Sequence, residues 1–430
     1  MTRFNTQLVH GLPVNDNNTG AVNPPIYNSS TYAFESVETM PRWDYARSGN
    51  PTREFLEKQI AQLEHGTRGF AFGSGLAAIH AVLSIFQPGD RIVVGKNIYG
   101  GTYSLLNEYF ARWGVLVEAV DTADYEALDE AVSGRSVQGA CHGCPAKAVY
   151  YEVLTNPLLK VNSVARISEV AHRYGALSIV DNTVPTPYLL RPIEFGADIV
   201  VHSTTKGITG HGNALGGMVV DAGRFDWNNG KFPQFTREEL VISDQRAGEW
   251  NSFHSRFGNQ AFIKRIRIKY LRTFGAVQSP FNAYMQLIGL ETLTVREKQE
   301  VASATAIAEH LTTLPHVTSV NYVALKDAPT HDLACKYLPN GVGTILSFTV
   351  EGDESNVERI LDATKVFSYV PNIGDSRSLI VNPTKVTHRE VPTDYYESAG
   401  VDDSLIRLSI GLENVGDLIA DLDQAIAGAY

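Results

Sequence analysis

Two short apolar runs, each ending in a polar residue that can do chemistry, constrain this chain more than any other feature. The first is Leu177-Ser-Ile-Val-Asp181, and the second is Asp198-Ile-Val-Val-His202, followed by Ser203-Thr-Thr-Lys206. Runs of this length and composition predict buried strands. In an open α/β sheet, ligands bind outside the carboxyl ends of the strands. The pattern therefore predicts an aspartate and a lysine at one site.

An aspartate and a lysine in this arrangement are what a pyridoxal 5'-phosphate (PLP) site requires. The lysine amine condenses with the cofactor's aldehyde as a Schiff base, and the carboxylate holds the proton on the ring nitrogen. We expect Lys206 and Asp181 to take these roles. Alone, the pair is weak support, because a lysine beside a Ser/Thr-rich loop is more often a solvated surface group.

An upstream turn supplies a phosphate-binding element. Phe70-Ala-Phe72 indicates the end of a strand, Gly73-Ser74-Gly75 a tight turn, and the residues from Leu76 onward an amphipathic helix. Glycines let the backbone approach an anion, and a helix N-terminus offers unpaired N–H groups. The hydroxyls of Ser203 and Thr205 add donors beside the expected Schiff-base lysine. The three segments together converge on one phosphorylated ring.

Strands and helices alternate through the middle of the chain. The apolar run Ala148–Glu152 predicts a strand, and a helix over Arg166–Tyr174 is expected between the caps Asn162-Ser163 and Gly175. This alternation is typical of a mostly parallel sheet covered on both faces. From about Gly223 to Ser279 it stops, which favours a surface excursion.

After that stretch, the sequence indicates a smaller unit. A long helical pattern runs from about Leu290 through Leu311, followed by two strand-like runs, Val342–Val350 and Val366–Val370. At 430 residues and 43% hydrophobic, the chain is large enough for a major and a minor domain.

Charge and cysteine content exclude several classes of function. The formal net charge of −11 argues against a nucleic-acid or anionic-membrane partner, and no apolar run long enough for a membrane span or signal peptide appears. We therefore expect a cytoplasmic protein. Cys141-His-Gly-Cys144 has metal-ligand spacing but no second ligand pair, so we expect no metal and read Cys141, Cys144 and Cys335 as surface thiols.

Seven motifs together resemble the Cys/Met-metabolism family of PLP-dependent enzymes. They run in the family's order, almost end to end: Tyr45-Ala-Arg47-Ser-Gly-Asn50-Pro51-Thr52, Gly73-Ser-Gly-Leu-Ala-Ala, Tyr99-Gly-Gly-Thr-Tyr, Asn156-Pro157, Asp181-Asn-Thr, Ser203-Thr-Thr-Lys206 and Arg407-Leu-Ser-Ile-Gly-Leu-Glu-Asn. The resemblance implies an α/β, aspartate-aminotransferase-like fold (fold type I), with a mostly parallel sheet in a large PLP domain and a smaller α/β C-terminal domain. It implies an N-terminal arm over residues 1–55, a PLP-binding domain over 56–289 and a C-terminal domain over 290–430.

The resemblance also implies a role for each matching residue. Lys206 and Tyr99 would be catalytic, with Tyr99 also stacking on the cofactor ring, and Arg407 and Asn372 would bind the amino-acid substrate. The cofactor-binding set would be Gly75, Leu76, Tyr99, Asn156, Asp181, Ser203, Thr205 and Lys206, with Tyr45 and Arg47 reaching the phosphate from a neighbouring subunit. Such sharing implies an oligomer, in this family a homotetramer built from dimers. Three of these residues have an alternative interpretation. In it, Tyr99 is a core aromatic, Asn156 is a turn residue and Arg407 is a structural arginine.

Finer features favour one subfamily. Methionine γ-lyases typically carry cysteine where this chain has Gly101, and Asn372-Ile-Gly-Asp375 resembles a segment of O-acetylhomoserine sulfhydrylases. The resemblance thus implies γ-replacement on O-acetylhomoserine, with sulfide or a thiol giving homocysteine or an analogue. Lys385 departs from the small hydroxyl residue of those enzymes and either alters the substrate pocket or points to solvent. A γ-lyase and a catalytically silent binding protein are the alternatives.

Overall fold

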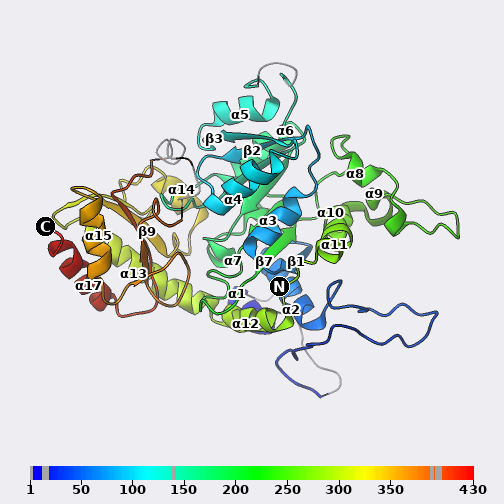
Figure 1. Cartoon of the computed structure of the whole chain (residues 1–430), viewed down its shortest axis with the longest axis horizontal. Helices are drawn as coiled ribbons and strands as arrows, with labels where there is room; N and C mark the ends of the chain where they lie inside the picture. The colour runs from blue at the N-terminus through cyan, green and yellow to red at the C-terminus, as the bar shows by residue number, and fades with distance from the viewer. Residues whose placement is uncertain (1–2, 12–18, 138–141, 388–391, 393–399) are drawn as a thin grey trace.

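The large domain is built on a seven-stranded sheet that is parallel except for one strand. The computed structural model describes residues 3–11, 19–137, 142–387, 392 and 400–430 (Figure 1). Across the sheet the order is β1 (Arg68–Phe72), β7 (Gly217–Asp221), β6 (Ile199–His202), β5 (Leu177–Asp181), β4 (Ala148–Glu152), β2 (Arg91–Gly95) and β3 (Leu116–Val120). Only β7 runs antiparallel to its neighbours. The expected α/β class with a mostly parallel sheet is confirmed.

Helices cover both faces of this sheet, so most of its strands are buried on both sides. Val149 and Tyr151 of β4 face one hydrophobic core, and Ala148 and Tyr150 face another. The covering helices include α2 (Pro51–Leu63), α3 (Gly75–Leu83), α4 (Gly100–Ser104), α5 (Tyr125–Ser133), α6 (Val164–Arg173) and α7 (Thr186–Leu189). This double burial explains why the central strands are continuous apolar runs rather than alternating ones.

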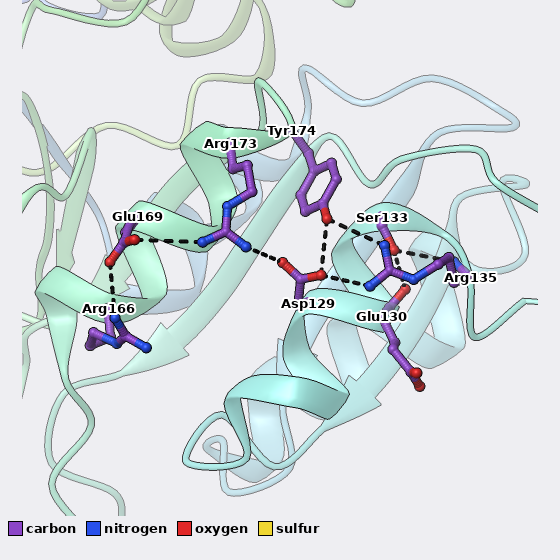
Figure 2. A network of polar contacts seen from close by, with 8 residues as sticks. All are labelled: Asp129, Glu130, Ser133, Arg135, Arg166, Glu169, Arg173 and Tyr174. Atoms are coloured by element: carbon purple, nitrogen blue, oxygen red, sulfur yellow. Dashed lines mark hydrogen bonds and ion pairs between the residues drawn. The ribbon is translucent and has the colours of Figure 1, made fainter.

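The local signals for α6 act as expected from the sequence. The Ser163 hydroxyl caps the helix by accepting the N–H of Arg166, and Gly175 adopts φ +63° just past its end. On the surface, Asp129 of α5 accepts hydrogen bonds from Arg135, Arg173 and Tyr174, which ties α5 to α6 (Figure 2). Solvent screens ion pairs that are this exposed, so the network adds little to the packing of α5 on α6.

The smaller domain contains a five-stranded, mostly antiparallel sheet. Its order is β10 (Ser368–Tyr369), β11 (Leu379–Val381), β12 (Leu405–Ser409), β9 (Ile345–Val350) and β8 (Val317–Asn321), flanked by α14 (His331–Tyr337), α15 (Glu354–Ala363) and α17 (Val415–Ala427). The expected helix near 290–311 is confirmed as α13 (Leu293–Leu311), preceded by α12 (Pro280–Glu291). The expected strand runs correspond to β9 and β10, whereas the sequence did not identify β8, β11 and β12 as strands.

The expectation of a surface excursion between Gly223 and Ser279 is wrong for its aromatic side chains. Trp227 is 1% exposed, stacks on Phe262 at 5.3 Å between ring centroids, and packs against Phe235. The segment folds into short helices: α8 (Pro233–Thr236), α9 (Phe253–Phe257), α10 (Ala261–Arg265) and α11 (Arg272–Phe274). Trp250 is exposed, and α8 and α9 lie at the edge of the molecule (Figure 1). The buried aromatic side chains of this segment thus belong to the hydrophobic core on one face of the large sheet.

The N-terminal part consists of one packed helix and one projecting segment. Helix α1 (Phe4–His10) packs against α2 and α12, while the irregular segment 20–49 projects from the body (Figure 1). A single bridge, Thr31 to Tyr45, links two parts of this segment. Helix α2 begins at Pro51 and continues past residue 55, where the sequence placed the end of an arm. The division into an arm and two domains stays a prediction.

The two described cysteines, Cys144 and Cys335, are free thiols at the surface. Cys141 lies outside the described residues. Among the residues that the structure describes, no three His, Cys, Asp or Glu side chains gather to hold a metal ion. In the same part of the chain, no helix has the length and apolarity needed to cross a membrane.

Candidate active site

The carboxyl ends of β4, β5 and β6 place the expected cofactor residues at one edge of the sheet. Glu152 and Asp181, the last residues of β4 and β5, are direct neighbours in the parallel register. Asp181 is buried, and its two carboxylate oxygens accept the Tyr150 hydroxyl and the Thr183 N–H, each at 3.0 Å. These bonds fix the carboxylate in one orientation, as a group that must hold a ring proton requires.

Lys206 lies four residues beyond the end of β6, in a largely buried position. Its Nζ donates a hydrogen bond to Asn372 Oδ1 at 2.6 Å. Burial, and secondarily the positive charge of Arg407, lower the pKa of the Lys206 amine to about 8. A substantial fraction of the amine is therefore neutral, and so nucleophilic, near physiological pH.

The turn between β1 and α3 has the shape of an anion cradle. The Ser74 hydroxyl caps α3 by accepting the N–H of Ala77. In the part of the chain that the structure describes, the N–H groups of Gly75 and Leu76 have no acceptor. A Cβ on Gly75 would lie 2.6 Å from the Ser203 Cβ, so only glycine allows this turn to approach Ser203 so closely. The helix N-terminus therefore faces the loop that carries Lys206.

The hydroxyl groups of the Lys206 loop are partly engaged. Thr205 Oγ1 accepts the N–H of Gly216 at 3.0 Å and donates to its carbonyl at 3.1 Å. The backbone N–H of Ser203 donates to Thr183 Oγ1 at 2.8 Å. Thr205 thus braces the loop, and a phosphate contact for this residue stays a prediction.

Arg407 is a buried cation held by two polar residues. It projects from β12, is 2% exposed, and donates from Nη1 to Asn156 Oδ1 and from Nη2 to the Asn372 carbonyl, each at 3.1 Å. Its Nε has no partner among the described residues, and no described carboxylate pairs with it. Burial lowers the pKa of Arg407 to about 10, against a smaller opposing effect of Tyr99. A buried guanidinium without a counter-ion is a natural binding point for a carboxylate.

Tyr99 lies at the mouth of this site rather than in the core. The residue is 43% exposed, just before α4, so it is not the core aromatic of the alternative interpretation. A Cβ on Gly101 would lie 2.6 Å from the Tyr99 ring and 3.2 Å from Leu76 Cδ1. The ring therefore rests on the Gly101 backbone, and a larger residue at position 101 would displace it.

A cavity of about 420 Å³ adjoins Lys206, which is large enough for a small ligand. Thr205, Lys206 and Asn372 line it, together with Pro371 and residues 212–215. The structure thus joins residues from both domains around one lysine.

Tyr45 and Arg47 do not line this cavity. They lie on the projecting segment, where Tyr45 is 42% exposed and the Arg47 guanidinium sits 5.0 Å above its ring. The Arg47 carbonyl accepts a hydrogen bond from Arg53, and the Ser48 carbonyl accepts one from Arg267. These two arginines, of which Arg53 is buried and Arg267 partly buried, anchor the segment at its base. Within this chain, neither of the two predicted phosphate ligands lines the cavity beside Lys206.

Lys385 does not line the cavity either. Its amine forms an ion pair with Glu354 of α15, and half of its side chain is exposed. Of the two interpretations of this residue, the structure favours the one in which it points to solvent. His388, three residues further along the chain, lies outside the described residues.

Three supporting residues received no role from the sequence. Glu152, Tyr150 and Thr183 contact the predicted site residues directly. Glu152 was expected at the same sheet edge, because it ends an otherwise apolar strand, and Thr183 belongs to the motif Asp181-Asn-Thr. Tyr150 carried no signal, because it resembles an ordinary strand residue.

The pKa of Lys206 can be tested without any cofactor. In the apoprotein, we expect an amine-selective reagent to label Lys206 with a rate that rises with pH to a midpoint of about 8. Arg407→Gln should move the midpoint upward, because it removes a positive charge that disfavours protonation. Peptide mapping by mass spectrometry measures the labelling. A midpoint close to 10.5, that of an ordinary lysine, would contradict the buried environment.

Comparison with known proteins agrees with this geometry. The profile of the Cys/Met metabolism PLP-dependent enzymes matches residues 5–427. The chain is 36% identical to the O-acetyl-L-homoserine sulfhydrylase of Leptospira meyeri, covering 98% of this chain and 96% of that protein. It is 37% identical to the cystathionine beta-lyase of Lactococcus lactis subsp. cremoris (strain MG1363), covering 99% of each.

A solved structure gives the same result for the fold. A crystal structure from Campylobacter jejuni, named as an O-acetylhomoserine (thiol)-lyase, superposes with a TM-score of 0.91 at 32% identity. The match covers 99% of this chain and 100% of that one, which carries N'-pyridoxyl-lysine-5'-monophosphate. The chain therefore belongs to the family of Cys/Met metabolism PLP-dependent enzymes.

Proposed function

We propose that this enzyme catalyses γ-replacement on O-acetylhomoserine, with sulfide or a simple thiol as the nucleophile and homocysteine or an analogue as the product. The observation that carries the proposal is the contact between Lys206 Nζ and Asn372 Oδ1 at 2.6 Å. It places the segment that resembles sulfhydrylases in direct contact with the cofactor lysine. The 36% identity to a relative named as an O-acetyl-L-homoserine sulfhydrylase supports the same conclusion.

The residues at the sheet edge fit PLP. The close approach of Gly75 to Ser203 leaves a cradle that a Cβ would fill, with the N–H groups of Gly75 and Leu76 directed out of the helix end. We assign the phosphate to this cradle, with Ser203 and Thr205 nearby. Asp181 would hold the proton on the ring nitrogen, and Lys206 would make the covalent attachment.

Two further residues would contact the cofactor ring. The Tyr99 ring, resting on Gly101, would stack on its face. Asn156, whose side chain is nearly buried, would approach its phenolic oxygen while continuing to hold Arg407. When bound, PLP supplies an electron sink for carbanion chemistry at the substrate.

The protein's own groups would orient the substrate and move its protons. Arg407 would bind the α-carboxylate and so set the direction of the Cα–H bond. Lys206, with its lowered pKa, would take the proton from Cα and then one from Cβ. The Tyr99 hydroxyl would assist the leaving group at Cγ. After acetate departs, hydrosulfide would add at Cγ, and Lys206 would return the two protons to Cβ and Cα.

A γ-lyase is the second candidate. Its support is the 32% identity, with a TM-score of 0.84, to a solved structure from Lactobacillus plantarum that is named as a cystathionine gamma-lyase. Against it stands Gly101, whose lack of a side chain lets Tyr99 lie where it does; the lyase-type cysteine at this position would push against that ring. A catalytically silent protein has little support, because every residue that the chemistry needs is present.

We also propose a cytoplasmic homotetramer, built from dimers that share their active sites. Its support is the position of Tyr45 and Arg47 on the segment 20–49, which projects from the body of the chain (Figure 1). A neighbouring subunit could then supply both residues to the phosphate. The site would be complete only in the oligomer.

The replacement reaction has a direct test. We expect O-acetylhomoserine with sulfide to give homocysteine faster than O-acetylhomoserine alone gives 2-oxobutanoate, with both products quantified by mass spectrometry. Lys206→Ala should give neither product while remaining folded. Equal release of 2-oxobutanoate with and without sulfide, and no homocysteine, would favour the lyase instead.

Arg407→Lys tests the carboxylate clamp. Lysine keeps the charge but loses the bidentate fork, so we expect KM to rise about tenfold or more with cofactor content unchanged. Arg377→Lys is the matched control, since Arg377 is an exposed arginine of the same domain that pairs with Asp375. Steady-state kinetics and cofactor absorbance measure the two effects. Unaltered kinetics in Arg407→Lys would make this arginine structural.

Subunit complementation tests the shared site. Arg47→Ala and Lys206→Ala chains should each be nearly inactive, but heterodimers of the two contain one site with neither defect. An equal mixture after exchange should recover about a quarter of wild-type activity. Subunit exchange is verified by native mass spectrometry. Complete exchange without recovery would mean that one chain builds the phosphate site alone.

A further inference from the structure

A buried carboxyl, Glu152, stands behind the proposed active site without a part in its chemistry. It ends β4, is 6% exposed, and lies beside Asp181 in the parallel register. Its Oε1 accepts the backbone N–H of Tyr99 at 2.6 Å, and its carboxyl also accepts the backbone N–H of Asn156. One side chain therefore holds two segments that are 57 residues apart in the sequence.

Both segments carry residues that matter to the proposed function, on which this inference rests. Tyr99 begins the turn into α4 and presents its half-exposed ring over Gly101. Asn156 accepts a hydrogen bond from Arg407 Nη1 at 3.1 Å. The backbone positions that Glu152 fixes thus set both the expected ring-stacking face and one of the two supports of the expected carboxylate clamp.

We propose that Glu152 is a positioning residue that holds the Tyr99 ring and the Asn156–Arg407 pair in register with each other across the cofactor site. It acts as a hydrogen-bond acceptor for two backbone N–H groups. It does not need to touch the substrate or the cofactor.

The surroundings of Glu152 indicate that acceptor geometry, and not negative charge, is what the site uses. Burial, and then the neighbouring Asp181 carboxylate, raise the pKa of Glu152 well above its ordinary value, although its two N–H donors oppose the shift. The neighbouring Asp181 is the carboxylate proposed to hold the ring proton, so the site needs no second negative charge at position 152. A glutamine at position 152 keeps one carbonyl oxygen, which can take the place of Oε1 and accept the Tyr99 N–H.

Three substitutions separate these properties. Glu152→Gln keeps the length and an acceptor oxygen but removes the carboxyl. Glu152→Asp keeps the carboxyl but is one methylene too short to reach both N–H groups. Glu152→Ala removes the acceptor and leaves two buried donors unpaired. Asn162→Ala is the matched control, because Asn162 supports the same strand end by donating to the Glu152 backbone carbonyl at 2.8 Å.

The measurements use the assembled holoenzyme and two ligands that need no γ chemistry. The first is PLP itself, rebound to the resolved apoenzyme and followed by tryptophan fluorescence quenching. The second is L-alanine, which offers an α-carboxylate without a γ leaving group, followed by the change in cofactor absorbance. Both readouts hold for any amino-acid chemistry at this site, so they fail or succeed independently of the proposed γ-replacement.

We expect Glu152→Gln to bind both ligands within about twofold of wild type, since its acceptor remains. Glu152→Asp and Glu152→Ala should bind PLP and L-alanine about tenfold more weakly, a loss equal to about one buried hydrogen bond. Asn162→Ala should match wild type in both affinities, even if its thermal midpoint falls. Rescue by Gln alone is a result that general destabilisation would not give.

Two outcomes overturn the proposal. If Glu152→Gln is as impaired as Glu152→Ala, the negative charge and not the acceptor matters. If Glu152→Asp binds both ligands like wild type, the reach to Tyr99 and Asn156 is unimportant. Should Glu152→Ala fail to fold, the comparison of Gln with Asp still decides, because these two changes are nearly matched in volume and polarity to the native residue.

Discussion

The site depends on a close backbone contact between the two domains. A Cβ on Gly374 would lie 2.6 Å from the Gly207 nitrogen, and Gly374 has φ +63°, so the segment 372–375 can rest on the loop after Lys206 only with glycine there. The Ser376 N–H donates to the Gly210 carbonyl at 2.9 Å and continues the contact. This docking brings Asn372 to the Lys206 amine. Without this contact, Lys206 of the large domain and Arg407 of the smaller domain would not meet at one site.

The large-domain side of this contact is also held from behind. Arg296 of α13 is buried and donates from Nη2 to the carbonyls of Gly207 and Gly289, each at 2.9 Å. Two buried carboxyls on the same helix, Glu297 and Glu300, have pKa values raised to about 8 and about 7, first by burial. Helix α13 therefore fixes the loop that carries Lys206 through the Arg296 side chain. Glu297 and Glu300 are partly neutral, so they offset only part of the positive charge of Arg296.

Local patterns in the sequence were enough to predict the part of the site that comes from single β–α units. Asp181, Ser203 and Gly75 each follow directly from a strand and the turn after it, so their position at one sheet edge follows from topology alone. The same reasoning could not find β8 and β12, which are partly polar, or β11, which has only three residues. It also placed the Trp227 segment on the surface, because aromatic residues without periodicity do not show which neighbour will bury them.

Contacts between distant segments were beyond what patterns alone could predict. Arg407 and Asn156 are 251 residues apart, and Lys206 and Asn372 are 166 apart. Resemblance to a family assigned these residues to one site, but it did not predict their hydrogen bonds to each other.

Lys385 shows that a departure from the family pattern can also mislead. It drew attention to a side chain that is half exposed and pairs with Glu354. A substitution near a motif does not imply a position in the pocket.

The coupling between Lys206 and Arg407 has a consequence for the order of events. Arg407 lowers the pKa of Lys206 through its positive charge, and in the described chain no carboxylate offsets that charge. A carboxylate bound to Arg407 would neutralise much of it, and would therefore let the pKa of the Lys206 amine rise again. In the apoprotein, whose clamp is empty, the amine is thus more neutral and a better nucleophile for the proposed attachment of the cofactor. It becomes a stronger base once the clamp is filled, which is when the proposed reaction needs a proton removed from Cα.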